Sequence, residues 1–281
     1  YYIQQWGSIM QFFVDDFDRI PEIQDFDVKR IFSQPRAHWL CKNPKNLEFR
    51  LQRFMVRCGS KVPILVLYNI PNRDLGSYSA GGTSGREEYL KFVSAVAKGL
   101  DSRPALIILE PDAVAHAVTS KDKSLISSRL QLLAEAATIL RAHNSETKIY
   151  LDVGHPRWVP AIEIKEAIAH VPGISGVSIN VSNFVPLWEC LVYGESLGVP
   201  YVIDTSRNGN NQYHSEEDGW CNPMNRKIGV PPRDFFETRL AGFENLDAYL
   251  WIKIPGESDG ECNGGPKAGQ FWYKYAKGLV S

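Results

Sequence analysis

The hydrophobic positions of this chain form seven short runs of four to six residues, and longer amphipathic segments separate them. The runs cover residues 37–40, 62–67, 105–109, 148–152, 176–180, 200–204 and 248–252. Most runs are continuous rather than alternating, which is typical of strands that are buried on both faces. The pattern therefore predicts seven strands of a parallel sheet.

The segments between the runs have the spacing of helices that bury one face. A capping-box pattern at 84–87 precedes one of them. One apolar stripe at helical spacing is Tyr89, Phe92, Val93, Val96 and Leu100, and a second is Ile126, Leu130, Leu133, Ala137 and Leu140. Alternating strands and helices indicate parallel pairing with right-handed crossovers. Seven strands in 281 residues favour an α/β barrel over an open sheet.

Polar residues follow nearly every predicted strand at its carboxyl end. They are Tyr68 and Asn69, Glu110 and Asp112, Asp152 and His155, Asn180 and Asn183, Asp204, and Lys253. Any one of them is more often a helix cap or a loop anchor than a functional group. Because the carboxyl ends of parallel strands meet at one edge of such a fold, their repetition predicts a single polar cleft there.

The composition excludes several classes of function. A net charge of −1 gives no electrostatic case for binding nucleic acid or an anionic membrane. No apolar run approaches the roughly 20 residues that cross a bilayer. The five cysteines have no CxxC spacing, and the motifs of dinucleotide, P-loop and serine-hydrolase sites are absent. We therefore expect neither a metal nor an organic cofactor.

What remains is a set of carboxylates beside aromatic residues. The carboxylates are Asp74, Asp112, Asp152, Asp204, Glu257 and Asp259. Glycoside hydrolysis requires one carboxyl that stays protonated and a second that is ionised. A single tryptophan is more often part of the core, but Trp39, Tyr68, Trp158 and Trp220 all lie near the acid-bearing loops, where they could stack on sugar rings. The combination favours a sugar-binding cleft.

Seven segments together resemble the family 6 glycoside hydrolases. They are YNIPNRD (68–74), LEPDAV (109–114), DVGHPRW (152–158), NVSNF (180–184), DTSRNGN (204–210), GWCNP (219–223) and WIKIPGESDG (251–260). The resemblance extends from about Trp39 to Phe271. It implies an inverting β-1,4-glucanase or cellobiohydrolase with a distorted, seven-stranded barrel. We expect residues 1–281 to form one catalytic domain, with 1–36 packed on the barrel as an N-terminal segment of unclear role.

The resemblance also implies roles for individual residues. Asp112 falls on the general acid, Asp74 on an aspartate that tunes the acid and contacts the catalytic water, and Asp259 on a third aspartate that leaves the identity of the base open. Tyr68 falls beside the sugar at the point of cleavage. The positions that match substrate-binding residues are Trp39, Ser79, His155, Trp158, Asn183, Trp220, Lys253 and Glu257.

Other residues are expected to support this site. Arg73 should pair with acid groups near Asp74, and Glu110, Asp152 and Asp204 are expected to act as supporting carboxylates behind it. The resemblance pairs Cys221 with Cys262, which leaves Cys41, Cys58 and Cys190 as buried free thiols. Family members often have a cysteine directly after the second aspartate. This chain has Leu75 there, so the Asp74 loop is expected to be more mobile.

Two further expectations concern the mode of action. The apolar run 106–109 and the Asp74 carboxylate should both raise the pKa of Asp112 and keep it protonated near neutral pH. Only eight residues, 260–267, separate Asp259 from Ala268, and a loop of this length is too short to cover much of the cleft. We therefore expect an open cleft and a secreted, monomeric endoglucanase that acts on β-1,4-glucan.

Three alternatives stay open at this point. The chain could be a cellobiohydrolase of the same family, or a carbohydrate-binding protein on the same scaffold that has lost catalysis. The presence of both Asp74 and Asp112 argues against the second. A barrel enzyme that acts on a phosphorylated metabolite is the third, and the phosphate-binding motif that it needs is missing.

Overall fold

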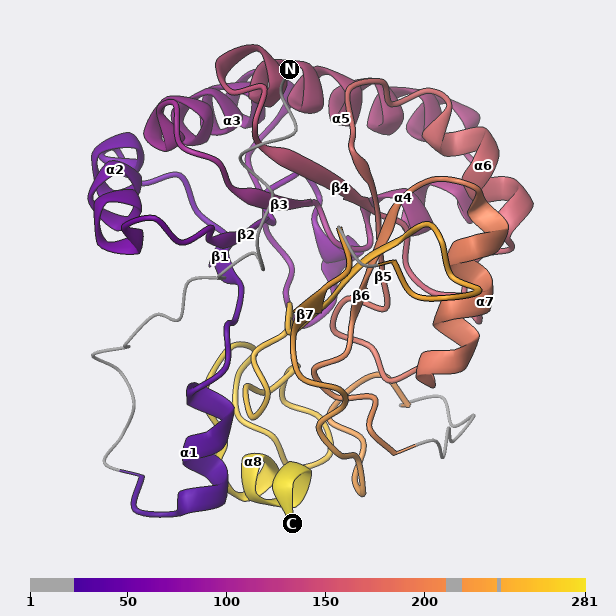
Figure 1. Ribbon diagram of the computed structural model, residues 1–281. Helices are drawn as coiled ribbons and strands as arrows, with labels where there is room; N and C mark the ends of the chain where they lie inside the picture. The colour runs from indigo at the N-terminus through magenta and orange to yellow at the C-terminus, as the bar shows by residue number, and fades with distance from the viewer. Residues whose placement is uncertain (1–22, 211–218, 237–238) are drawn as a thin grey trace.

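One curled sheet of eight strands forms the centre of the computed structural model, which describes residues 23–210, 219–236 and 239–281 (Figure 1). The strands are β1 (His38–Leu40), β2 (Ile64–Leu67), β3 (Leu106–Leu109), β4 (Lys148–Asp152), β5 (Gly176–Ile179), β6 (Tyr201–Asp204), β7 (Arg233–Asp234) and β8 (Leu246–Leu250). Their order in the sheet is β1-β2-β3-β4-β5-β6-β8-β7.

The distorted barrel predicted from the sequence is confirmed. Each of the seven hydrophobic runs forms a strand, and these seven strands pair with one another in parallel. The eighth strand, β7, is antiparallel to β8 and was not predicted. It consists only of Arg233 and Asp234, so it has no hydrophobic run by which to recognise it.

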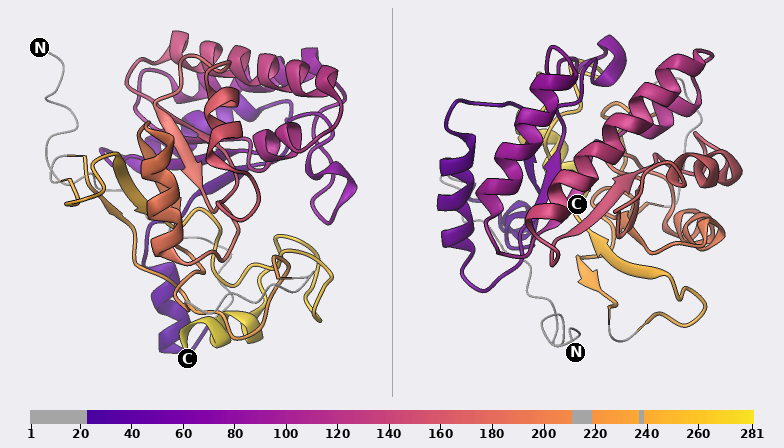
Figure 2. Two further views of the ribbon diagram at one scale, coloured as in Figure 1. Left: turned by 90° about the vertical axis from the view of Figure 1, so that its right-hand side faces the viewer. Right: turned by 90° about the horizontal axis from the view of Figure 1, so that it is seen from above.

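Helices lie around the outside of the sheet, as the view from above shows (Figure 2). The helices are α1 (Phe26–Phe32), α2 (Leu47–Cys58), α3 (Arg86–Leu100), α4 (Ala113–Val118), α5 (Lys123–His143), α6 (Ala161–Ile168), α7 (Leu187–Leu197) and α8 (Tyr273–Val280). The predicted stripe on α3 is buried. On α5, Ile126 is partly buried and the rest of the stripe is buried.

The capping box before α3 uses a different glutamate from the one expected. The N-cap of α3 is Gly85, and the backbone N–H and hydroxyl of Ser84 both donate to Glu88, at 2.8 and 2.7 Å. Glu87 instead accepts a hydrogen bond from Lys91, one turn further along the helix, at 2.7 Å. The helix begins close to the predicted position. Which glutamate bonds to Ser84 depends on the side of the first turn from which each side chain points.

Strand residues alternate between two hydrophobic layers. In β2, Ile64 and Val66 lie inside the barrel, whereas Leu65 and Leu67 belong to the layer between the sheet and the helices. Both faces are buried, which explains why the sequence pattern is continuous. Tyr68 continues the inner series directly after β2, so its ring lies at the carboxyl end of the barrel interior.

The first and last parallel strands, β1 and β8, meet at a seam where the described residues form no strand pairing. Two hydrogen bonds connect the sides: the Ala37 N–H donates to the carbonyl of Trp251 at 3.1 Å, and the Trp39 indole N–H donates to the carbonyl of Ile252 at 2.9 Å. The barrel is therefore held together at the seam while its carboxyl end stays open to a cleft.

The described part of the N-terminal segment packs beside the C-terminal helix. Helix α1 contributes Val28 and Ile31 to a small cluster with Trp251, and Lys277 of α8 pairs with Asp25 at 2.6 Å. Both helices lie at the lower end of the molecule in Figure 1. Residues 1–22 of the predicted N-terminal segment lie outside the described residues.

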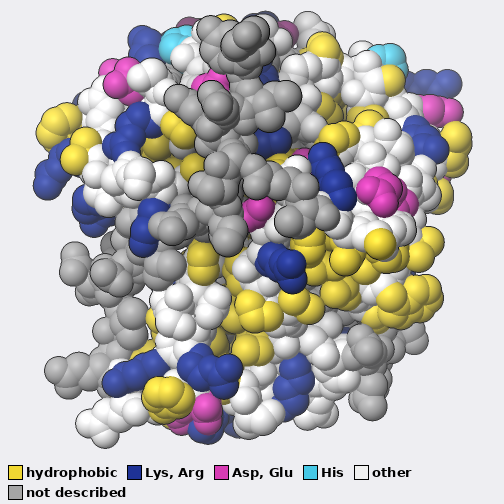
Figure 3. All heavy atoms as spheres, in the orientation of Figure 1, with side chains coloured by type: hydrophobic (Ala, Val, Ile, Leu, Met, Phe, Trp, Pro, Cys, Tyr) yellow, Lys and Arg dark blue, Asp and Glu magenta, His cyan; other side chains and the backbone are white. Residues whose placement is uncertain are grey.

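The outer surface has an apolar region over α7. Figure 3 shows hydrophobic side chains gathered there and on the segments beside it, and Trp188 and Val192 of α7 are exposed. Within the described ranges, no helix combines the length and apolar character that crossing a membrane requires.

Candidate active site

A cleft of about 620 Å³ lies at the carboxyl ends of the strands. All twelve residues that the sequence predicted for catalysis or substrate binding line it: Trp39, Tyr68, Asp74, Ser79, Asp112, His155, Trp158, Asn183, Trp220, Lys253, Glu257 and Asp259. Arg73 lines it as well. The fold thus brings these residues together from loops that are far apart in the sequence, and their individual roles remain predictions.

Asp112 lies between the end of β3 and the start of α4. Both Glu110 and Asp112 have positive φ angles, 49° and 68°, so the chain turns sharply and their side chains do not share a face. The Asp112 N–H donates to Asp152 Oδ1 at 2.8 Å, while the half-buried Asp112 carboxyl lines the cleft. Burial and the Asp152 and Asp74 carboxylates raise the pKa of Asp112 well above its ordinary value. A carboxyl that stays protonated near neutral pH can act as a general acid.

Asp74 begins residues 74–82, the Asp74 loop, which lies within the connection between β2 and α3. Its Oδ2 accepts the backbone N–H of Ser79 at 2.6 Å, which closes a tight turn. Burial raises the pKa of Asp74, and the bond from Ser79 and the Arg73 charge act in the opposite direction. Ser79 therefore contacts Asp74 through its backbone. Ser79 also lines the cleft, and its predicted role in substrate binding remains a prediction.

Among the described residues, Arg73 forms no ion pair with an acid group, contrary to the expectation. Its guanidinium donates to the carbonyls of Ser79, Cys41 and Tyr68, at 2.8, 3.2 and 2.5 Å, and lies over the Tyr68 ring at 4.6 Å. The prediction was wrong because three backbone acceptors surround the guanidinium. Arg73 consequently joins the base of the Asp74 loop to Tyr68 and to the segment after β1.

Asp259 lies in a buried cationic environment. It pairs with Arg207 at 2.8 Å and with Lys253 at 3.3 Å, and it accepts the N–H of Asn222 at 3.0 Å. Burial by itself would raise the pKa of Asp259, but the two cations outweigh burial and hold it below its ordinary value. Asp259 is therefore ionised and a weak proton acceptor. Sequence reasoning missed Arg207, although a lone arginine directly after a buried strand was a usable signal.

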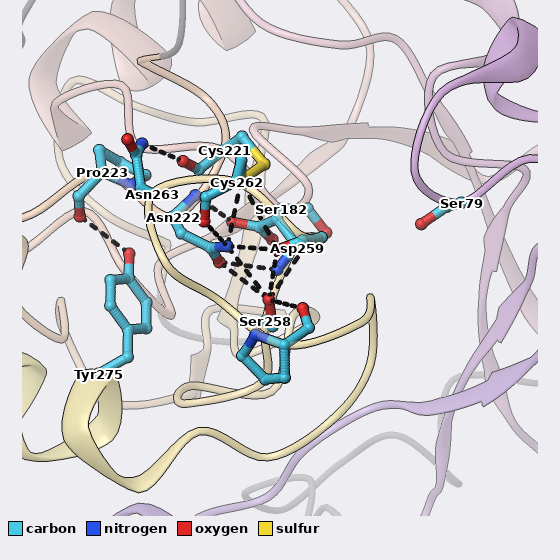
Figure 4. Close-up of a disulfide and its surroundings, with 12 residues drawn as sticks. Ser79, Ser182, Cys221, Asn222, Pro223, Ser258, Asp259, Cys262, Asn263 and Tyr275 are labelled. Carbon is cyan, nitrogen blue, oxygen red and sulfur yellow. Dashed lines mark hydrogen bonds between the residues drawn. A yellow bond between two sulfur atoms is a disulfide. The ribbon is translucent and has the colours of Figure 1, made fainter.

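The predicted disulfide between Cys221 and Cys262 is present. Figure 4 shows it beside a dense set of hydrogen bonds around Asn222, whose Oδ1 accepts the N–H of Asp259 at 2.8 Å and whose Nδ2 donates to the carbonyl of Gly260 at 2.8 Å. The disulfide thus joins the Trp220 segment to the segment that contains Asp259.

The three remaining cysteines are free thiols, as expected, but one of them is less buried than expected. Cys58 and Cys190 are buried, whereas Cys41 is only partly buried and lines the cleft.

Removing the disulfide is expected to cost stability. The double variant Cys221→Ala, Cys262→Ala should lower the free energy of unfolding by about 2–4 kcal/mol, because the bond closes a loop with a sequence separation of 41. Denaturant titration of both proteins measures the difference. Cys58→Ala, which removes a buried thiol without opening a loop, gives the baseline. A loss in the double variant no larger than this baseline would contradict the expectation.

Two supporting carboxylates are fully buried below the cleft. Glu110 accepts the N–H groups of Asn69 and Ile70 at 2.9 and 3.0 Å, so it fixes the backbone directly after Tyr68. Asp152 accepts the N–H of Asp112. Each carboxylate thus binds the segment that follows the neighbouring strand, and its supporting role remains a prediction.

Glu110 should make stability depend on pH. Burial raises its pKa to about 7, against partial lowering by the amide bonds from Ile70 and Asn69. The folded protein therefore binds this proton more tightly than the unfolded chain, whose pKa is near 4.5. The contribution to stability is full below the unfolded value and is lost as pH rises toward about 7. Melting temperatures of the wild type and of Glu110→Gln, measured from about pH 4.5 to about pH 7, test this contribution. An equal change of melting temperature with pH in the two proteins would contradict it.

Asp204 has the largest set of backbone contacts among these supporting carboxylates. It is almost fully buried at the end of β6. Its two oxygens accept the N–H groups of Ser182, Ser206, Ile252 and Lys253, at 3.0 to 3.3 Å. These amides belong to the segments after β5, β6 and β8, so one carboxylate connects three of the segments that form the cleft.

Two groups of aromatic side chains line the cleft. Trp39 contacts Tyr68 edge-on, at 5.4 Å between centroids. Trp158 contacts the rings of His116 and His155, at 5.0 and 5.8 Å. Burial lowers the pKa of both histidines to about 4, so each ring is neutral at neutral pH. His116 was not predicted as a site residue, although it lies one helical turn after Asp112 and therefore on the same side of α4.

Tyr78 is a second lining residue that the sequence did not identify. It lies on the Asp74 loop, and its ring is 6.1 Å from the ring of Trp220 on the other wall. The two walls of the cleft meet although segment 260–267 is short, because the Asp74 loop extends to the opposite wall. The expectation of an open cleft, which considered only the length of 260–267, did not include this contact.

Comparison with known protein families gives one match over nearly the whole chain. The model of "Glycosyl hydrolases family 6" matches residues 5–281. The match begins well before Trp39, so it extends into the N-terminal segment in which the sequence analysis recognised no relationship.

Individual relatives agree with this match. Endoglucanase A of Cellulomonas fimi is 36% identical over 261 residues, which cover 89% of this chain and 54% of that protein. Endoglucanase 1 of Streptomyces halstedii is 38% identical over 236 residues, with 78% and 69% covered. This chain thus spans about half the length of the Cellulomonas protein.

A solved structure has nearly the same fold. The endoglucanase Cel6 from Mycobacterium tuberculosis, in complex with methyl-cellobiosyl-4-deoxy-4-thio-β-D-cellobioside, is 35% identical. The TM-score is 0.89, and 98% of each chain is covered.

Proposed function

Because the chain belongs to glycosyl hydrolases family 6, we propose that it is an inverting endo-β-1,4-glucanase that cleaves internal bonds of cellulose or related β-glucans. The observation that carries the proposal is the Asp112 carboxyl, which lines an aromatic cleft and has a pKa well above its ordinary value. The endoglucanase names of the relatives from Cellulomonas and Streptomyces support endo action.

In the proposed mechanism, Asp112 donates its proton to the glycosidic oxygen as the bond to the leaving sugar breaks. A water molecule attacks the opposite face of the ring, which inverts the anomeric centre. Tyr68, at the inner end of the cleft, would contact the distorted ring. The proton that Asp112 loses returns from solvent after the products leave.

We assign activation of the water to Asp74, directly or through a second water, rather than to Asp259. A general base needs a pKa near the working pH. Arg207 and Lys253 lower the pKa of Asp259, whereas burial raises that of Asp74. The buried charge of Asp259 would then pair with Lys253 at the cleft wall and with the fully buried Arg207.

The sugar rings would stack on Trp39, Trp158 and Trp220. The indole N–H of Trp39 is already bound to the carbonyl of Ile252, so Trp39 would contact sugar with its ring face. His155 lines the cleft, where its neutral ring would bind a sugar hydroxyl. Asn183, Lys253 and Glu257 would bind further hydroxyls.

Release of reducing ends from barley β-glucan tests the activity, and proton NMR of the first product tests the stereochemistry. We expect the α-anomer to appear first. An initial β-anomer would overturn the inverting mechanism. No release from acidic to mildly alkaline pH, combined with retained binding of the glucan, would instead favour a carbohydrate-binding protein that lacks catalysis.

A cellobiohydrolase is the second candidate, because the rings of Tyr78 and Trp220 approach each other to 6.1 Å from opposite walls of the cleft. Viscosity loss plotted against new reducing ends separates the two. Endo action lowers the viscosity of carboxymethylcellulose steeply at few cleavages, whereas release of cellobiose from chain ends leaves it almost unchanged.

We further propose that the chain forms a single, monomeric catalytic domain that works outside the cell. The Cys221–Cys262 disulfide supports an oxidising compartment. Light scattering during size-exclusion chromatography tests the oligomeric state, and a mass of twice the monomer would contradict it.

A further inference from the structure

The Asp74 loop and the Asp259 segment form opposite walls of the cleft. Figure 4 shows Ser79, on the Asp74 loop, well apart from the cluster around Asp259, Asn222 and the disulfide. The side chain of Tyr78, the residue before Ser79, reaches across this space to the opposite wall.

Gly260, the residue after Asp259, forms the seat for the Tyr78 ring. A Cβ added to Gly260 would lie 2.3 Å from Cγ, 2.5 Å from Cβ and 2.8 Å from Cδ1 of Tyr78, which are its three nearest neighbours. Gly260 is not among the glycines with positive φ. Its backbone therefore permits a side chain, and the Tyr78 ring is what excludes one.

We propose that Tyr78 is a positioning residue, whose ring seats on Gly260 and thereby holds the Asp74 loop against the Asp259 wall. This inference rests on the proposed function. It assigns Tyr78 a task that differs from sugar stacking, because the ring acts by fixing the loop that contains Asp74.

The rest of the loop explains why such a contact matters. Arg73 and the Asp74–Ser79 bond fix the internal shape of the loop, but they connect it only to itself and to the segments after β1 and β2. Leu75, in a left-handed conformation with φ 45°, is exposed. Tyr78 provides the contact from the loop to the far wall.

The Tyr78 contact matters for catalysis because it fixes the position of Asp74. Asp74 must lie at a fixed distance from the point where water attacks, and a misplacement of about 1 Å can cost about 10²-fold in rate. A released loop would move Asp74 relative to Asp112, because β3 and α4 hold Asp112 independently. Loss of the seat should therefore lower kcat more than it raises KM.

Two single variants and their combination test the proposal. Tyr78→Ala removes the ring, and Gly260→Ala fills the seat while Tyr78 stays in the chain. Each should lower kcat on barley β-glucan by about ten- to 100-fold, and the double variant should lose no more than the worse single variant, because both disrupt one contact. Tyr78→Phe keeps the ring and should stay within about threefold of the wild type.

Hydrogen–deuterium exchange of residues 74–82, without substrate, supplies a readout that does not depend on activity. Exchange should become faster in Tyr78→Ala and in Gly260→Ala. The control is Tyr273→Ala, which removes a similarly exposed tyrosine, 48% against 49%, from α8 outside the cleft. It should leave both kcat and exchange in this loop unchanged.

The outcomes separate this inference from the proposed function. A rise in KM with unchanged kcat would make Tyr78 a sugar-binding residue and overturn the proposal. Additive losses, or a Gly260→Ala variant that behaves as the wild type, would overturn it as well. If the wild type cleaves no glucan, the proposed function fails, and unchanged exchange in the two variants would then refute the seat independently.

Discussion

Asp112→Asn is expected to lower cleavage of β-glucan by about 10²–10⁴-fold while largely sparing glycosides with good leaving groups. The leaving oxygen of a glucan must be protonated as the bond breaks, and Asn cannot donate an acidic proton. An activated aryl leaving group needs no such proton. Comparing kcat/KM for barley β-glucan and for an aryl cellobioside measures the difference.

The fold should tolerate this substitution. Asn adopts left-handed conformations readily, so the φ of 68° at position 112 is retained. The backbone bond from residue 112 to Asp152 also remains. Asp101→Asn is a matched control, because Asp101 is an exposed aspartate with a similar φ of 55°. It should cleave both substrates as the wild type does.

Two results would remove Asp112 from the acid role. The first is an equal loss on both substrates, which indicates damage to binding or to the fold. The second concerns pH. The raised pKa of Asp112 predicts that glucan cleavage by the wild type falls as pH rises through the folded pKa of Asp112. The same alkaline fall in the Asp112→Asn variant would assign it to another group.

Asp204→Ala is expected to lower the free energy of unfolding by several kcal/mol, because each buried donor that loses its acceptor costs about 1–3 kcal/mol. The substitution would leave four backbone N–H groups without their acceptor, and three of these four hydrogen bonds are buried. Because these amides belong to three strand ends, the loss should spread across the cleft. Denaturant unfolding followed by tryptophan fluorescence measures it.

Asp122→Ala provides the contrast. Asp122 also accepts two backbone N–H groups, from Ser124 and Leu125, but at the exposed start of α5. Water can replace the carboxylate there, so we expect a cost of about 1 kcal/mol. Similar costs for the two variants would show that burial of the Asp204 network contributes little.

The sequence predicted a feature well where the fold constrains residues that are adjacent along the chain. Strands buried on both faces need continuous apolar runs, and all seven parallel strands were found from them. The two-residue strand β7 was missed because its only residues, Arg233 and Asp234, are polar. Glu88 replaced Glu87 in the capping box because helix geometry, rather than spacing alone, selects the partner.

The members of the cleft were also readable, because the carboxyl ends of parallel strands must converge. The interaction partners of these cleft residues were harder to predict. Arg73 was assigned to a carboxylate but binds three backbone carbonyls, and Arg207, which neutralises Asp259, was not identified at all. Which charge meets which acceptor depends on three-dimensional distances that motif spacing does not contain.

By itself, the sequence determined the barrel, the edge at which polar residues gather, the family and the cysteine pair, since each follows from local patterns or from motifs in a fixed order. Only the tertiary structure decided how these residues act on one another. The positive φ angles of Glu110 and Asp112 send two nearby carboxylates to different tasks, and a glycine without room for a Cβ receives Tyr78 from the opposite wall. The pKa of a carboxyl and the seat of a ring depend on what lies within a few ångströms in space, and that neighbourhood exists only once the chain has folded.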